Sequence, residues 1–103
     1  MKPNGFAVRT TEYQGNTLVN ICDLELIGRT VTEGKLKMHI SKEFYFGEMV
    51  GEAEALSLIR KCTIINLVGE RSVSLAVDNK IGSPHAIREI EDVPFLMVYK
   101  FMH

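Results

Sequence analysis

The sequence predicts an α+β domain, with a mostly antiparallel sheet of about five strands and two helices on one face. Three observations predict it. Two runs rich in β-branched and aromatic residues open the chain, two segments with apolar residues at helical spacing occupy its middle, and a further β-rich run closes it. The predicted order is β-β-β-α-α-β-β. The 103 residues are expected to form a single domain, 1–103, around one core.

The chain begins with a predicted β-hairpin. Its strands are Phe6–Glu12 and Thr17–Cys22, where β-branched and aromatic residues gather. The connection between them, residues 13–16, is polar and contains Gly15, which can adopt the positive φ of a tight turn.

A third strand is expected after a loop. Residues 23–34 mix short apolar pairs with polar residues and glycine, which predicts a loop with one helical turn, ending at Gly34. Residues 35–41 alternate apolar and polar side chains, the pattern of a half-buried strand. His39 belongs to the polar set, so we expect it to face solvent.

The first helix is predicted over Val50–Cys62, after an aromatic loop at residues 44–47. Apolar residues recur at helical spacing along it. Acidic residues near its start and basic residues near its end complement the helix dipole; they are Glu52, Glu54, Arg60 and Lys61.

The second helix is predicted over Leu67–Asn79, and Gly82 with Pro84 blocks its continuation. A short strand at Ala86–Ile90, a turn at 91–94 and a final strand at Phe95–Phe101 complete the chain. The final strand is apolar on both faces. It is therefore expected to be central in the sheet or to form part of an interface.

Composition narrows the classes of function. Twelve basic residues nearly balance thirteen acidic ones, so no overall field attracts the protein to nucleic acid or to anionic lipid. No apolar run approaches the ~20 residues that a bilayer requires, which predicts a cytoplasmic protein without membrane contact. Cys22 and Cys62 are expected to be reduced, buried thiols. The cysteines and histidines lack the local pairs of a zinc site, so no metal or cofactor is expected.

The first candidate binding site is the segment Asn66–Arg71. Asn66 is predicted to cap the second helix, and Gly69 in its first turn would permit close approach by backbone or ligand. The free N–H groups of the helix start and Arg71 would then hold a phosphate or carboxylate. Glu70 opposes an anion there, and the alternative is that Glu70 and Arg71 are structural. The segment is not a Walker motif, because the Gly-Lys-Ser/Thr ending is missing.

The second candidate is aromatic. Phe44, Tyr45 and Phe46 cannot all point into one core, so at least one ring is expected at the surface, and Tyr45 and Phe46 are candidate binding residues. A comparable set lies on the last strand: Phe95, Met97, Tyr99 and Phe101. Lysines near aromatic surface are the combination that single-stranded RNA binding uses; the candidates are Lys35, Lys37, Lys42 and Lys100. The alternative is a sheet packed under helices or a dimer interface, since the Gly-Phe-Val-x-Phe type of RNA-binding signature is missing.

Catalysis is not favoured. An enzyme would use either a histidine base, His39 or His85, with a nucleophile from Cys22, Cys62 or a serine, or Glu43 and Glu48 as paired carboxylates. No motif places any of these groups together. The protein is therefore expected to have no catalytic residues.

Four stretches of the chain carry a resemblance to a known family. They are 22–28, 33–34, 44–47 and, above all, Thr63–Arg71. With them the chain resembles an archaeal family of uncharacterised proteins, domain of unknown function 424. The chain departs from the family pattern Val-Pro-His-Ala at Val93–Leu96, so no role of a histidine there is carried over. The resemblance implies a small, archaeal, cytoplasmic α+β protein and no established activity; analogy alone points to RNA or translation.

Three hypotheses follow. The leading one is a non-enzymatic binding module that contacts RNA or a translation-related protein through the Asn66–Arg71 segment and the aromatic loop. The second is a self-associating structural protein, a homodimer, because the final strand is apolar on both faces. The third is a small enzyme that acts on an anionic metabolite at the start of the second helix.

Overall fold

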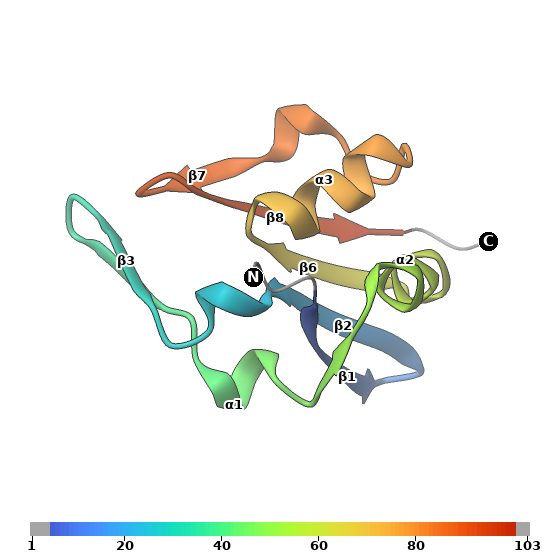
Figure 1. The fold of residues 1–103 in the computed structure, drawn as a ribbon. Coiled ribbons are helices and arrows are strands. Elements are labelled where there is room, and N and C mark those ends of the chain that lie inside the picture. The colour runs from blue at the N-terminus through green and yellow to red at the C-terminus, as the bar shows by residue number, and fades with distance from the viewer. Residues whose placement is uncertain (1–4, 101–103) are drawn as a thin grey trace.

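The structure, a computed structural model, describes residues 5–100 and contains a six-stranded sheet in the order β5-β1-β2-β6-β8-β7 (Figure 1). Its strands are β1 (Phe6–Tyr13), β2 (Asn16–Asp23), β5 (Glu48–Val50), β6 (Ile64–Val68), β7 (Arg88–Ile90) and β8 (Val93–Tyr99). β2 and β6 run parallel, and the other neighbouring pairs are antiparallel. The α+β prediction is confirmed, with six strands in this sheet where about five were expected.

The N-terminal hairpin forms as predicted. β1 and β2 pair along their full length, from Phe6 opposite Asp23 to Tyr13 opposite Asn16. Gln14 and Gly15 make the turn, both with positive φ (51° and 81°), the conformation that follows the twist of a two-residue hairpin. β5 then pairs with β1 as an edge strand that the sequence analysis did not predict.

The central strand β6 was not predicted from the sequence either. It lies between β2 and β8 and pairs with both over its whole length. The predicted helix start at Leu67 is wrong, because α3 spans Glu70–Asp78. The predicted capping role of Asn66 is wrong too, since this residue lies in the middle of β6. The strand tolerates a polar residue there because Asn20 lies directly opposite on β2 and hydrogen-bonds to it.

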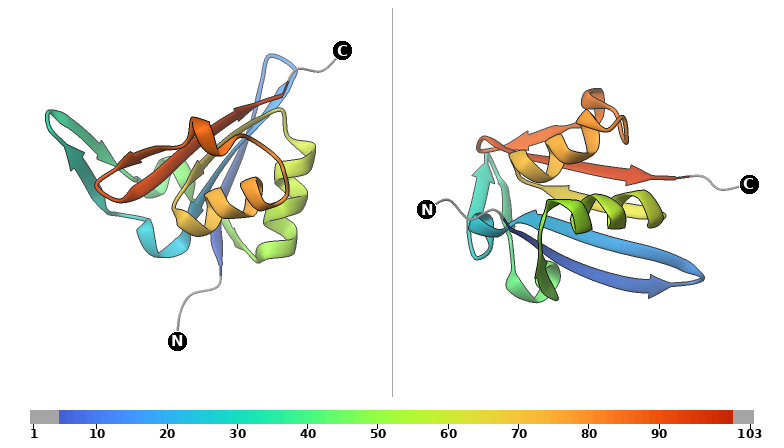
Figure 2. Two further views of the ribbon diagram at one scale, coloured as in Figure 1. Left: turned by 90° about the horizontal axis from the view of Figure 1, so that it is seen from above. Right: turned by 45° about the vertical axis from the view of Figure 1, so that its right-hand side comes forward.

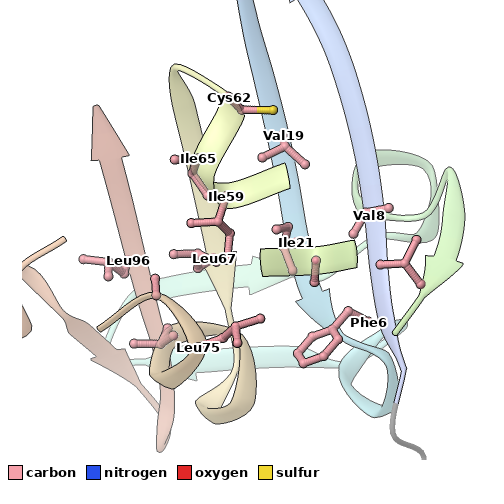
Figure 3. Packing of buried hydrophobic residues seen from close by; sticks show 14 residues of the cluster. Phe6, Val8, Val19, Ile21, Ile59, Cys62, Ile65, Leu67, Leu75 and Leu96 are labelled. Carbon is pink, nitrogen blue, oxygen red and sulfur yellow. The ribbon is translucent and has the colours of Figure 1, made fainter. Parts of the chain in front are cut away.

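Helices α2 (Glu52–Lys61) and α3 lie together on one face of the sheet, as predicted (Figure 2). Apolar side chains from both helices and from the strands fill the space between the layers, among them Ile59, Leu75 and Ile21 (Figure 3). Lys100, which follows β8, binds the C-terminal end of α2. Its Nζ donates to the carbonyl oxygens of Ile59 and Arg60 at 2.5 and 2.8 Å. These bonds satisfy carbonyls that the last turn of α2 leaves unpaired.

None of the helices that the structure describes has the length and apolar character needed to cross a membrane.

A separate hairpin, β3 (Thr30–Glu33) and β4 (Leu36–His39), projects beyond one end of the sheet (Figure 1). The predicted helical turn within residues 23–34 is confirmed as the 3-10 turn η1 (Leu24–Leu26). The rest of that segment is not all loop, because β-branched residues 30–32 pair as a strand with β4. The predicted strand at 35–41 is confirmed in β4, and His39 is exposed as expected.

The expected aromatic loop at 44–47 is partly a helical turn, α1 (Lys42–Tyr45). Ser41 explains it, since its Oγ accepts a hydrogen bond from the Phe44 N–H at 3.2 Å and caps the turn. This turn, η1 and the β3–β4 hairpin cover one end of the second face of the sheet. Their side chains form a second buried cluster there with residues of the sheet, including Ala7, Cys22, Tyr45 and Val68.

The C-terminal strands differ from the prediction in their bounds. The short strand expected at Ala86–Ile90 is confirmed as β7, preceded by the 3-10 turn η2 (Pro84–Ala86). The turn before β8 is confined to Glu91 and Asp92, both at positive φ, so residues 93–94 belong to the strand and not to the turn. Phe101, the predicted end of the last strand, lies outside the described residues.

Candidate functional site

The predicted Asn66–Arg71 site runs from the middle of β6 into the start of α3, where Asp23 already binds the first N–H groups of the helix. Asp23 ends β2 and is buried, with 3% of its surface exposed. Its Oδ2 accepts the Arg71 N–H at 3.0 Å, and its Oδ1 accepts the N–H and the hydroxyl of Ser72, both at 2.7 Å. The first N–H groups of α3 therefore bind a carboxylate of this chain, and an external anion would have to displace Asp23.

Gly69 makes this arrangement possible. It precedes α3 with φ 107° and ψ 157°, and so lies just outside the first turn in which it was expected. A side chain at this position would place its Cβ 2.4 Å from the Cγ atom of Asp23. The close approach predicted for Gly69 is present, and its partner is Asp23.

Arg71 joins three parts of the N-terminal region. Its Nε and Nη2 donate to the two carboxylate oxygens of Glu25 at 3.2 and 2.5 Å, and Nη2 also donates to the Gly5 carbonyl oxygen at 2.9 Å. Its guanidinium lies 4.8 Å from the centre of the Phe6 ring. The hydrogen bond to Glu25 raises the pKa of Arg71. Glu70 is exposed and takes no part in these contacts.

We expect Arg71→Ala to lower the free energy of unfolding by about 1–2 kcal/mol, because it removes a bidentate ion pair with Glu25 and a hydrogen bond to the Gly5 carbonyl oxygen. The side chains of Arg71 and Glu25 are 32% and 44% exposed, so part of this loss should disappear at high salt. Urea unfolding at low and high salt measures both effects. Arg71→Lys keeps the charge but not the bidentate guanidinium, so its stability should lie between those of the wild type and Arg71→Ala. An unchanged stability of Arg71→Ala would contradict a structural role for Arg71.

The second face of the sheet is left uncovered beyond α1 and the β3–β4 hairpin. The pairing register places its side chains in rows across the strands. One row consists of Arg9, Asn20, Asn66 and Met97, and the next of Thr11, Leu18, Ile64 and Tyr99. We call these two rows the open face; its buried member is Asn20, whose side chain contacts Phe44 of α1. Met97 is 64% exposed and Tyr99 52%; both lie on the part of β8 that extends beyond its pairing with β7, where β8 forms the edge of the sheet.

A groove of about 370 Å³ lies where the open face meets α1 and β4. Its walls are mostly apolar and include Met38, Phe44, Phe95 and Met97. Arg88 also lines the groove and is the one charged residue among the described residues that do so. It lies on the same face as the groove, because it pairs with Phe95 across β7 and β8.

The side chains of Asn20 and Asn66 form a chain of hydrogen bonds beneath this groove. The Asn20 amide nitrogen donates to the Phe44 carbonyl oxygen at 3.1 Å, and the Asn66 amide nitrogen donates to the Asn20 side-chain oxygen at 2.8 Å. Asn20 is buried, with 3% exposed, whereas Asn66 lines the groove. Sequence reasoning singled out Asn66 for a different role and did not include Asn20, Arg88 or Asp23.

The aromatic candidates separate into buried and exposed rings. Tyr45 is buried, and its pKa is raised mainly by that burial. Phe46 is half-buried, with Lys42 Nζ 5.9 Å from its ring centre. Phe44 is the exposed ring, at 53%, and it packs edge-on against Tyr45. The prediction that at least one of the three rings lies at the surface is confirmed, although the exposed ring is not one of the two chosen as binding candidates.

Among the described residues, no hydrogen bond joins the imidazole of His39 or His85 to a cysteine or serine side chain. His39 Nδ1 is 2.9 Å from the Thr30 hydroxyl on the neighbouring strand, and His85 is exposed in η2. Both cysteines are buried and unpaired, as expected. Burial, with the charges of Asp23 and Glu25, raises the pKa of Cys22 to about 12, so its nucleophilic thiolate is disfavoured. Within residues 5–100, no three histidine, cysteine or acidic side chains gather closely enough to hold a metal ion.

Comparison with known proteins agrees with the fold. A crystal structure of an uncharacterized conserved protein from Methanopyrus kandleri resembles this chain with a TM-score of 0.81, at 22% sequence identity and with 96% of each chain covered. No curated protein matches the sequence at a significant level. The model of the family described as protein of unknown function, DUF424, matches residues 11–101. The chain therefore belongs to the DUF424 family.

Proposed function

We propose that this chain is a cytoplasmic, non-enzymatic binding module for single-stranded RNA, and that the open face with its groove is the contact surface. The observation that carries the proposal is the exposure of Met97, Tyr99 and Phe44 around an uncovered sheet face. Bases of single-stranded RNA stack on aromatic rings such as those of Tyr99 and Phe44, because every base has a flat apolar surface.

The charges around this face suit a nucleic acid. Arg9 lies in the first row of the open face, and Arg88 lines the groove. Both are exposed and available for phosphate or base contacts. Two such contacts give a shallow salt dependence, which is consistent with the nearly balanced net charge of −1.

Tyr99→Ala is expected to weaken binding of a single-stranded RNA oligonucleotide by about fivefold or more, because one stacked base contributes about 1–3 kcal/mol. Fluorescence anisotropy with a labelled oligonucleotide measures it. Arg88→Ala should also weaken binding, and the matched control Lys61→Ala, which removes an exposed cation from α2, should not. Equal affinity of the wild type and Tyr99→Ala, or equal binding of duplex RNA, would contradict the proposal.

Self-association is the second candidate, and it is favoured by the same exposed apolar residues, Met97 and Tyr99. A homodimer through the open face would bury both. Light scattering at micromolar concentration distinguishes the two candidates, because a dimer that Met97→Lys dissociates supports self-association, whereas a monomer that binds RNA supports the module.

A further inference from the structure

The groove on the second face offers two polar functions with fixed chemistry, an amide oxygen and a guanidinium. The amide oxygen belongs to Asn66, whose orientation follows from its neighbours. The Phe44 carbonyl can only accept a hydrogen bond, so Asn20 must turn its NH₂ group toward it. The Asn20 oxygen then faces Asn66, which must donate its own NH₂ group.

This chain of bonds leaves the Asn66 side-chain oxygen as an acceptor on the groove. Within the described part of the chain, that oxygen accepts no hydrogen bond. No buried side-chain nitrogen or oxygen of those residues lacks a partner, so the Asn66 oxygen is reachable from solvent. The amide is held by Asn20, which is itself 3% exposed, and binding does not require it to reorient.

Arg88 supplies the opposite function. Its strand is separated from β6 by β8 alone, and its position is two residues along β8 from that of Asn66, since Arg88 pairs with Phe95 and Asn66 with Met97. Its planar guanidinium donates two parallel hydrogen bonds to a matching pair of acceptors. The apolar side chains between Arg88 and Asn66, Phe95 and Met97, can contact the flat face of a ring.

We propose that this groove binds one unpaired guanine base of the RNA, with its N1–H and N2–H groups toward the Asn66 oxygen and its O6 and N7 atoms toward Arg88. The inference rests on the proposed function. Guanine alone among the four bases has two adjacent donors on one edge and two adjacent acceptors that match an arginine fork. Adenine offers its amino group to Asn66 but has no adjacent pair of acceptors. Cytosine has adjacent acceptors at N3 and O2 but lacks a ring N–H donor beside its amino group, and uracil has no adjacent pair of donors.

Short uridine-rich oligonucleotides that differ at one central position, guanine or adenine, test the proposal by anisotropy. We expect the guanine oligonucleotide to bind the wild type about tenfold more tightly than the adenine one. Inosine, which lacks the N2 amino group, should fall between them. Asn66→Ala and Arg88→Lys should each reduce the guanine preference to about twofold or less while the all-uridine oligonucleotide still binds.

Arg88→Lys keeps the proposal testable if Asn66→Ala destabilises the sheet, because Arg88 is exposed and keeps its charge in this variant. Tight binding of all oligonucleotides without a guanine preference would overturn the guanine pocket and leave the RNA-binding module intact. Failure of every oligonucleotide to bind would overturn both. Guanosine monophosphate that binds as tightly as the guanine oligonucleotide would identify a free nucleotide as the ligand and overturn the assignment to RNA.

Discussion

Asp23→Ala is expected to lower the free energy of unfolding by about 3 kcal/mol, because it leaves three donors at the start of α3 without their acceptor. Two of these donors belong to Ser72, which is completely buried, so water cannot replace the carboxylate without opening the structure. The same substitution disconnects the end of β2 from α3. Urea or thermal unfolding followed by circular dichroism measures the loss.

Ser72→Ala is the matched control for Asp23→Ala. It removes one of the three hydrogen bonds and keeps the two backbone ones, so it should lower the free energy of unfolding by about 1 kcal/mol. In the double variant the two losses should not add, because both act on the same carboxylate. A loss below about 1 kcal/mol for Asp23→Ala would contradict the role given to this residue.

Gly69→Ala should be at least as damaging, with an expected loss of about 4 kcal/mol. Its φ of 107° with ψ of 157° belongs to a region that is almost restricted to glycine, where another residue pays about 1–3 kcal/mol of strain. The added Cβ would also lie 2.4 Å from the Asp23 carboxyl carbon, and relieving this clash adds about 1–3 kcal/mol and weakens the cap.

Gly28→Ala separates the two causes. Gly28 has a similar φ of 95°, but a Cβ there would meet nothing within 4 Å. Gly28→Ala should therefore lower the free energy of unfolding through backbone strain alone, by roughly 1 kcal/mol. If both alanine variants unfold at the same urea concentration, the close contact between Gly69 and Asp23 adds nothing to the backbone strain, which contradicts the larger loss expected for Gly69→Ala.

Local sequence patterns predicted much of the fold correctly. The β1–β2 hairpin, the strand β4 and the helix α2 follow from alternation, turn residues and helical spacing, all of which act between residues near in sequence. The segment at residues 64–68 has an equally clear signal, a short apolar run that ends at a glycine. It was misinterpreted because Asn66 is a good helix cap when considered alone. Its true partner, Asn20, lies 46 residues away.

The candidate site likewise depends on contacts between residues that are far apart in the sequence. Gly69 was expected to allow a close approach, but nothing near it in the sequence indicates that the approaching group is Asp23, 46 positions earlier. Arg71 was expected to bind an anion, and its anion is Glu25 of the same chain. The exposure of Phe44 above the buried Tyr45 depends on how α1 packs against the sheet. Partners brought together by the parallel pairing of β2 with β6 leave no local pattern.

The most direct test of the central claim is an NMR titration of the isotope-labelled protein with a single-stranded RNA oligonucleotide, followed through the backbone amide shifts. We predict that the largest changes fall on the open face and groove, at residues 64–66, 88 and 95–99, with small changes in α2 and α3. Changes centred on the two helices, or no changes at millimolar RNA, would contradict an RNA-binding role for the open face.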